Sequence, residues 1–232
     1  MTDSIYKGKN GEYLKNNPTW HSEDSKWKAG QIFKILENNH INPKSVVEVG
    51  CGAGEILNQL HALMTDNVDF TGFDISPDAI EIAKPKEKNG LSFKCKDFLK
   101  TEKKTDLLLL IDVFEHIEDY LGFLKTLKGR AKNTVFHIPL DISVQSVMRN
   151  RLIYGRKKVG HLHHFMKDTA IATLIDAGYE VIDSFYTPSL LDLPSRSFLT
   201  KMAVLPRRLF YKINKDFTVK LLGGFSLMVL AK

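Results

Sequence analysis

The chain has 232 residues, 43% of them hydrophobic, with a formal charge of +6 and a sequence pI near 9.1. It is long enough for one sizeable core and too apolar to be disordered. Its longest apolar runs fall well short of the roughly 20 residues that a membrane-spanning helix needs. With only two cysteines and no charged-then-apolar leader at its start, it is unlike a secreted disulfide scaffold, so we expect a cytoplasmic protein.

The basic excess is concentrated in residues 149–158 and 206–215. Such clusters favour anionic partners, which include phosphorylated small molecules, membrane surfaces contacted peripherally, and nucleic acid. Solvated loops and helix faces would explain the clusters equally well, so charge alone does not decide. Nothing in the sequence indicates an oligomeric state.

Strands and helices alternate along the chain. We predict strands at 45–50, 68–74, 91–95, 105–111, 133–138, 179–186 and 224–231, and helices at 55–64, 76–84, 119–131 and 166–178. The uninterrupted "LLLLI" at 107–111 implies a strand that is buried on both faces, as in the middle of a parallel sheet. This alternation predicts a doubly wound α/β fold.

A glycine-rich turn follows the first strand, in "VVEVGCGAGEIL" at 46–57. A dinucleotide dehydrogenase would need glycine at position 55, which is Glu. The pattern E-x-G-x-G-x-G instead resembles motif I of class I S-adenosylmethionine-dependent methyltransferases. The resemblance implies that Glu48 organises the amino acid end of the cofactor, above a turn made of Gly50, Cys51, Gly52 and Gly54. It also implies a seven-stranded Rossmann-like sheet with helices on both faces and a reversed last strand.

Two further acids match this family at the ends of the next strands. Asp74, followed by Ile75, ends the second strand, where a carboxylate can accept both hydroxyls of a ribose. Asp97 follows the third strand at the family position that meets the adenine amino group, with Phe98 beside the ring. We therefore expect S-adenosylmethionine as cofactor and S-adenosylhomocysteine as product.

The fourth strand ends in "DVFEHIED", which in this family borders the acceptor. One interpretation is that Asp112, Glu115 and His116 cap the turn and touch the cofactor. A second makes His116 a general base, since imidazole titrates near neutral pH. A third notes that Asp112-x-x-Glu115-His116 looks like the metal-binding motif of ubiquinone-pathway and small-RNA 2'-O-methyltransferases.

The metal hypothesis needs a further ligand, and "GHLHHF" at 160–165 offers His161, His163 and His164. The spacing of His163 before Phe165 fits the small-RNA enzymes, so we predict a site of Asp112, Glu115, His116 and His163. Such a set suits Mg, Mn, Fe or Zn. Alternatively, these histidines order the acceptor pocket without metal, and His164 joins His116 as a candidate base.

We predict one methyltransferase domain over 1–232, with a helical cap at 1–40, a cofactor-binding core at 44–138, and insertions at 139–164 and 188–215 that shape the acceptor pocket. Within the cap, Trp27 is expected to pack, while His21 and Lys28 are candidate pocket residues.

The layout is similar to methyltransferases of bacterial surface-polysaccharide modification. We therefore expect methyl transfer to an oxygen or nitrogen of a small, anionic acceptor, such as a sugar, a nucleotide-linked compound or a phosphoramidate. The alternatives are an RNA 2'-O-methyltransferase, which is opposed by the lack of an RNA-binding module, and a non-catalytic S-adenosylmethionine-binding interaction protein.

Overall fold

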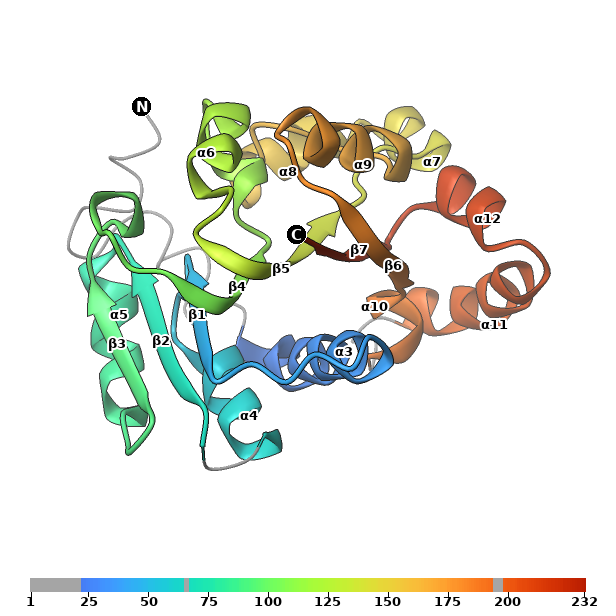
Figure 1. Ribbon diagram of the computed structural model, residues 1–232. Coiled ribbons are helices and arrows are strands. Elements are labelled where there is room, and N and C mark those ends of the chain that lie inside the picture. The colour runs from blue at the N-terminus through green and yellow to red at the C-terminus, as the bar shows by residue number, and fades with distance from the viewer. Residues whose placement is uncertain (1–21, 65–66, 194–197) are drawn as a thin grey trace.

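A seven-stranded sheet in the order β3-β2-β1-β4-β5-β7-β6 forms the centre of the molecule (Figure 1). The structure is a computed structural model, and it describes residues 22–64, 67–193 and 198–232. Neighbouring strands pair in parallel except at β7, which is antiparallel to both β5 and β6. The strands are β1 (Ser45–Val49), β2 (Asp69–Asp74), β3 (Leu91–Cys95), β4 (Thr105–Ile111), β5 (Ala131–Pro139), β6 (Val181–Thr187) and β7 (Ser226–Ala231). The predicted doubly wound fold with a reversed last strand is confirmed.

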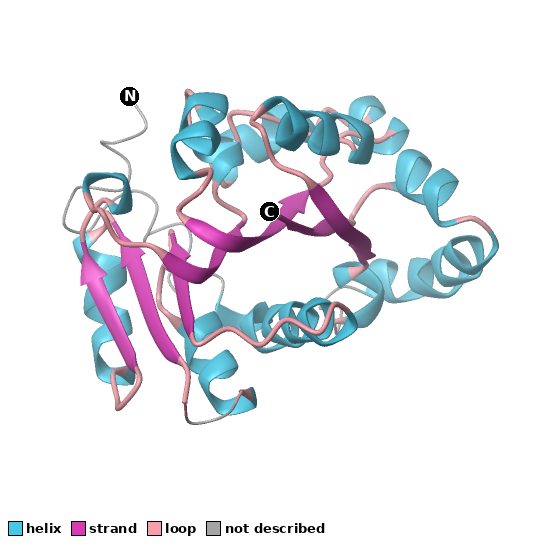
Figure 2. Ribbon diagram, in the orientation of Figure 1, coloured by secondary structure: helices cyan, strands magenta, loops and turns pink. Residues whose placement is uncertain are grey.

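Helices cover both faces of the sheet (Figure 2). One core cluster joins α3, α4 and α5 to one face, and a second joins α6 and α9 to the other. In β4, Leu107, Leu109 and Ile111 belong to the first cluster, while Leu108 and Leu110 belong to the second. The strand is therefore buried on both faces, as the apolar run predicts. These helices are α3 (Ser25–Asn38), α4 (Glu55–Leu63), α5 (Pro77–Ala83), α6 (Tyr120–Leu127) and α9 (Lys167–Asp176).

Both predicted insertions contain helices. The first holds α7 (Val144–Met148) and α8 (Arg151–Lys158), and the second holds α10 (Ser189–Asp192) and α11 (Phe198–Ile213), with α12 (Lys215–Leu222) after it. Short 3₁₀ turns complete the chain at η1 (Ser22–Asp24), η2 (Lys84–Lys86), η3 (Phe98–Lys100) and η4 (Phe114–His116). No helix in the described part of the chain is both long and apolar enough to cross a bilayer.

Local sequence explains where two elements begin and end. The side chain of Ser76 accepts a hydrogen bond from the Ala79 N–H and caps α5, and Pro77 occupies the first turn. The predicted helix at 119–131 was too long, because α6 ends at Leu127 and Gly129 adopts a φ of 80°. A left-handed residue breaks the helix and turns the chain directly into β5.

Candidate functional site

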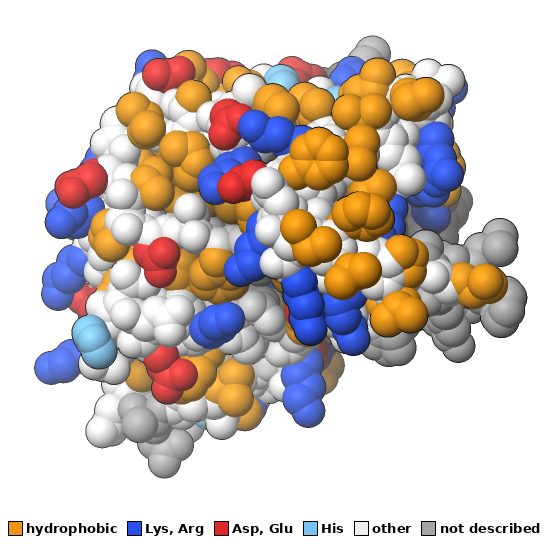
Figure 3. Space-filling model, turned by 90° about the vertical axis from the view of Figure 1, so that its right-hand side faces the viewer, with side chains coloured by type: hydrophobic (Ala, Val, Ile, Leu, Met, Phe, Trp, Pro, Cys, Tyr) orange, Lys and Arg blue, Asp and Glu red, His pale blue; other side chains and the backbone are white. Residues whose placement is uncertain are grey.

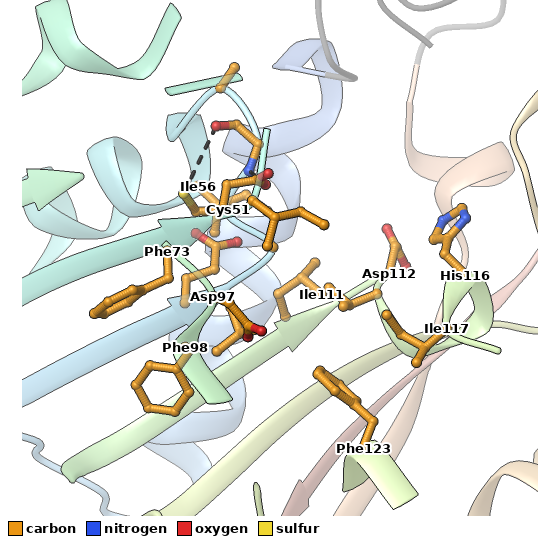
Figure 4. Close-up of a pocket in the computed structure, with 18 of the residues that line it drawn as sticks. Cys51, Ile56, Phe73, Asp97, Phe98, Ile111, Asp112, His116, Ile117 and Phe123 are labelled. Carbon is orange, nitrogen blue, oxygen red and sulfur yellow. Dashed lines mark hydrogen bonds between the residues drawn. The ribbon is translucent and has the colours of Figure 1, made fainter. Parts of the chain in front are cut away.

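A cavity of about 1130 Å³ lies at the carboxyl ends of β1, β2, β3 and β4. Figure 4 shows Cys51 and Asp97 on one side of it and Asp112, His116 and Ile117 on the other. The topology changes direction between β1 and β4, which is where open α/β sheets bind their ligands. Apart from Gly54, the predicted cofactor residues therefore line one common space, together with His116 of the predicted catalytic pair.

Packing as well as backbone conformation requires glycine at two positions of this turn. A Cβ atom on Gly54, at a φ of 72°, would lie only 2.4 Å from the buried ring of Phe93. One on Gly50, at a φ of 74°, would lie 2.9 Å from Cγ2 of Val113. The turn thus sits tightly between β3 and the residues that follow β4, and it lines the cavity.

Asp74 holds this turn against the end of β2. Its Oδ2 accepts a hydrogen bond from Gly52 N at 2.9 Å, and its Oδ1 accepts one from Ser76 N at 2.8 Å. Burial raises the pKa of this carboxyl, although these backbone donors oppose the rise. A carboxylate has about four lone-pair sites, so two backbone bonds leave capacity for ligand hydroxyls.

Glu48 lies at the floor of the cavity and is only 2% exposed. Its Oε2 has no hydrogen-bond partner among the described residues. Burial raises the pKa of Glu48 well above its usual value, against the opposing attraction of Lys28. A buried acid in this state would be stabilised by a cationic or N–H group of a ligand.

Asp97 and Phe98 follow the third strand, and both line the cavity. Asp97 borders the cavity and caps η3 by accepting a hydrogen bond from Leu99 N at 3.0 Å. The Phe98 ring is 1% exposed and packs edge-on against Phe73, with the Arg130 guanidinium over its face. Phe98 also lines the cavity, so its place beside the adenine ring stays a prediction.

Asp112 is the centre of a buried ion cluster. It has a φ of 54°, and its Oδ2 lies 2.8 Å from Lys28 Nζ while its Oδ1 lies 2.6 Å from His137 Nδ1. Lys28 also pairs with Asp24 at 3.0 Å, and His137 Nε2 lies 2.9 Å from Thr187 Oγ1. Burial opposes the charge of Asp112, yet His137 and Lys28 hold its pKa well below the usual range.

Asp112 belongs to this cluster rather than to the group of possible metal ligands around Glu115. Both of its oxygens are engaged by Lys28 and His137, and the ligand atoms that gather within 4.8 Å of one another come from Glu115, His116 and His161. Burial would lower the pKa of Lys28, but the carboxylates of Asp112 and Asp24 outweigh it and hold the pKa above its usual value. Lys28 and Asp112 both line the cavity and form a pair of opposite charges there.

A second group, Glu115, His116 and His161, offers one ligand atom from each residue, all within 4.8 Å of one another. Both carboxyl oxygens of Glu115 are buried and have no hydrogen-bond partner among the described residues. Burial raises the pKa of Glu115 well above its usual value. His116 Nδ1 lies 3.1 Å from the Gly160 carbonyl and His161 Nδ1 lies 2.6 Å from Asp141, so each imidazole can donate a hydrogen bond from Nδ1. Metal-binding histidines are usually oriented in this way.

The other two histidines of the 160–165 segment face elsewhere. His163 Nε2 lies 3.2 Å from the Glu118 carbonyl, and its ring packs against Tyr120. It therefore lies outside the group of Glu115, His116 and His161, in which His161 takes the place that was predicted for His163. His164 Nδ1 lies 3.0 Å from Asp141. Of the two candidate bases, His116 is among the described residues that line the cavity, and His164 is not.

The sequence reasoning missed two polar residues in or next to β5. Asp141 joins His161 and His164, and those hydrogen bonds lower its pKa against the effect of burial. His137 is buried within the strand and is joined to Asp112. A polar residue just after a strand and an imidazole inside an apolar strand were the available signals. Of the predicted cap residues, Trp27 is half-buried and donates to Asp192 at 3.2 Å, while His21 lies outside the described residues.

Comparison with known proteins agrees with this geometry. A family model described as a methyltransferase domain matches residues 22–184, and no curated protein sequence matches the chain. Among solved structures, the chain is similar to magnesium protoporphyrin IX methyltransferase from Synechocystis PCC 6803 with bound S-adenosylhomocysteine, at 16% identity and a TM-score of 0.57, covering 98% of this chain and 90% of that one. It is also similar to the plantazolicin methyltransferase BamL, at 18% identity and a TM-score of 0.57, covering 94% of this chain and 87% of that one. A third similar structure is the methyltransferase domain of bacterial CtHen1-C, at 18% identity and a TM-score of 0.56, covering 89% of this chain and 97% of that one. At such identities the likeness is one of fold.

Proposed function

This chain belongs to the class I S-adenosylmethionine-dependent methyltransferases, and on that premise we propose that it methylates an oxygen of a small, anionic acceptor beside a metal-binding cluster. The observation that carries the proposal is the buried carboxyl group of Glu115, which has no hydrogen-bond partner among the described residues and shares its surroundings with His116 and His161. His116 also lines the cavity, so the cluster borders the space where methyl transfer would occur.

The residues around the glycine turn fit the cofactor. The unpartnered Oε2 of Glu48 would receive the ammonium group of its methionine end, and Asp74 would receive its ribose hydroxyls. Ile75 and Leu99 border the same cavity and supply apolar surface for a base. S-adenosylmethionine brings a methyl group that is already activated on a sulfonium, so the protein's task is to align the reactants and exclude water.

Replacing Glu48 by Gln should weaken the binding of S-adenosylhomocysteine about 10- to 100-fold, because a charged hydrogen bond contributes roughly 1.5–3 kcal/mol. Isothermal titration calorimetry measures the change directly. Glu55→Gln is the matched control, since Glu55 lines the same cavity but its Oε1 is already held by Asn58 and Gln59. Equal affinities for the wild type and Glu48→Gln would remove Glu48 from the cofactor site.

The donor set of the cluster narrows the choice of metal. Two imidazoles and one carboxylate suit Mn, Fe or Zn, whereas Mg prefers oxygen ligands, and the expected second carboxylate of Asp112 is committed to ion pairs. Glu115, His116 and His161 would hold the ion, which would lower the pKa of an acceptor hydroxyl. The Asp141 carboxylate orients His161 for this purpose.

Two observations support a small, anionic acceptor. The cavity exceeds the 300–1,000 Å³ range that is usual for a single small ligand, which suggests room for donor and acceptor together. Arg156, Lys157 and Lys158 directly precede Val159, which lines the cavity, so their positive field would attract an anion towards it. In the alternative without a metal, His116 would take the acceptor proton, a role that is typically worth 10²- to 10⁴-fold in rate.

A labelled-methyl screen of sugar phosphates, nucleotide-linked sugars, phosphoramidates and RNA, run with and without chelator, tests the acceptor and the metal together. We expect transfer to an anionic small molecule, loss of transfer in chelator, and recovery on adding Mn or Zn. RNA 2'-O-methylation is the second candidate, favoured by the Glu115, His116 and His161 cluster. Exclusive transfer to RNA would select it, and activity that is indifferent to chelator would contradict the metal.

A further inference from the structure

Two basic segments without any acidic residue fold next to each other. Residues 142–167 and 193–215 together contain twelve Lys and Arg and no Asp or Glu, whereas the rest of the chain has 21 Lys and Arg against 27 Asp and Glu. The first segment forms α7 and α8, and the second forms α11. Because α12 contacts both α7 and α11, the two segments lie side by side, and the positive charge of the protein is concentrated in one region.

Large apolar side chains project from these same helices into solvent. On α11, Met202, Leu205, Leu209 and Ile213 recur every three or four residues and are 60–76% exposed, so they form one exposed stripe. Phe210 on α11 is also more than half exposed. Neighbouring helices add further side chains that are more than half exposed: Val144, Val147 and Met148 on α7, Ile153 and Tyr154 on α8, and Phe217 on α12. We call this surface of α7, α8, α11 and α12 the basic apolar face.

The view from the side of α11 and α12 shows these groups together. In Figure 3 hydrophobic side chains gather on one part of the surface, with Lys and Arg between and beside them. Scattered apolar residues are normal on a protein surface, whereas a continuous patch marks an interaction site. The helices are held in place by Arg207, which donates to the Gly223 carbonyl at 2.8 Å and to Gln145 Oε1 at 2.7 Å. The basic apolar face is therefore an ordered surface of the folded domain.

We propose that the basic apolar face binds the surface of an anionic lipid bilayer. An amphipathic helix that lies in the bilayer interface buries its apolar stripe among the acyl chains and places its Lys and Arg at the phosphate headgroups. Nucleic acid would use the cations but leave the aliphatic side chains of α11 in water. A protein partner, or a second copy of this chain, would cover the apolar stripe but would not account for the large excess of Lys and Arg over acidic residues on these helices.

Membrane docking would also position the catalytic cavity. Val159 lines the cavity and follows α8 directly, so a bilayer bound at this face would lie close to the edge of the cavity. The inference goes beyond methyl transfer itself, and its test does not depend on activity.

Vesicle co-sedimentation with the full chain tests the proposal. We expect binding to vesicles of phosphatidylcholine with roughly one third phosphatidylglycerol, weak binding to pure phosphatidylcholine, and release by high salt. The triple variant Leu205→Ser, Leu209→Ser, Ile213→Ser should lose about tenfold or more in vesicle partitioning. Changing Arg156, Lys157 and Lys158 to Gln should produce a similar loss on anionic vesicles only.

The matched control is Leu63→Ser with Ile175→Ser, two exposed apolar residues on α4 and α9. This variant should bind vesicles like the wild type, and circular dichroism with S-adenosylhomocysteine titration would establish that all variants are folded. The proposal is overturned if the wild type ignores anionic vesicles at low salt, or if the control loses as much binding as the α11 triple variant. It is also overturned if light scattering shows a dimer that the triple variant dissolves, or if the basic segments bind RNA in preference to lipid.

Discussion

Glu115→Gln is expected to abolish metal binding, to reduce methyl transfer at least about 100-fold, and to change the pH dependence of stability. The variant loses a carboxylate ligand, and replacing a metal's outer-shell partners alone typically costs 10–100-fold in affinity or activity. Calorimetric titration with Mn or Zn measures the first effect, and initial rates measure the second. Because metal binding requires the ionised carboxylate, the affinity of the wild type should rise with pH.

The stability effect follows from the raised pKa of Glu115. In the metal-free protein the folded state keeps the Glu115 proton, whereas the unfolded chain releases it above the ordinary pKa of about 4.3. The contribution of Glu115 to the free energy of unfolding therefore falls as pH rises, until the pKa of the folded state is reached. Relative to the wild type, Glu115→Gln should therefore gain stability between pH 4 and pH 8. Urea unfolding at both pH values, without metal, provides the comparison.

Glu81→Gln is the control for this experiment. Glu81 is an exposed acid on α5, so the substitution makes the same chemical change outside the cluster. It should shift stability by less than about 0.5 kcal/mol at either pH. Parallel stability curves for the wild type and Glu115→Gln, together with undiminished metal binding, would contradict both the buried ionisation and the ligand role.

Removing the Asp112 side chain should have the largest effect on stability. Asp112→Ala leaves His137 buried without its carboxylate and Lys28 with only Asp24, and breaking a buried pair in this way costs about 3–5 kcal/mol. Asp112→Asn should cost less, because Asn tolerates the positive φ that Ala adopts at a further cost of roughly 1–2 kcal/mol. Equilibrium unfolding in urea at pH 7 measures both variants.

The pH dependence has the opposite sign from that of Glu115. Since the folded pKa of Asp112 is held below the unfolded value of about 3.9, its stabilisation is complete above that value and is lost as pH falls through the folded pKa. Asp168→Asn serves as the control, because the Lys220 pair that it breaks is at least half exposed on both sides and contributes about 0–1 kcal/mol. A loss of comparable size in Asp112→Asn and Asp168→Asn would show that the buried cluster has no special importance.

The strands and the cofactor region were predictable because their signals are local. All seven strands appear within a few residues of their predicted bounds, since apolar runs and glycine breaks lie within single segments of sequence. The glycine turn, Asp74 and Asp97 meet at the cavity because parallel strands deliver their carboxyl ends to one edge of the sheet.

The acceptor side was less predictable because it depends on contacts between distant segments. Leu162 N and His163 N both donate to the Glu115 carbonyl, and this docking brings His161 rather than His163 next to Glu115 and His116. Sequence spacing could not decide between histidines two residues apart on a loop. In the same way, the partners of Asp112 are Lys28 and His137, which come from a helix and a strand far along the chain in either direction.

The position of β7 affects how the chain can fold. β7 is the last strand in the chain order, yet it inserts between β5 and β6, and it is the strand through which β6 joins the sheet. During synthesis the edge of β5 would stay open until residues 226–231 have emerged, because no earlier strand occupies that place. We expect the half of the sheet that contains β1 to β5 to form first, with β6 docking only afterwards. An incomplete chain would expose an unpaired strand edge, which is a site for aggregation.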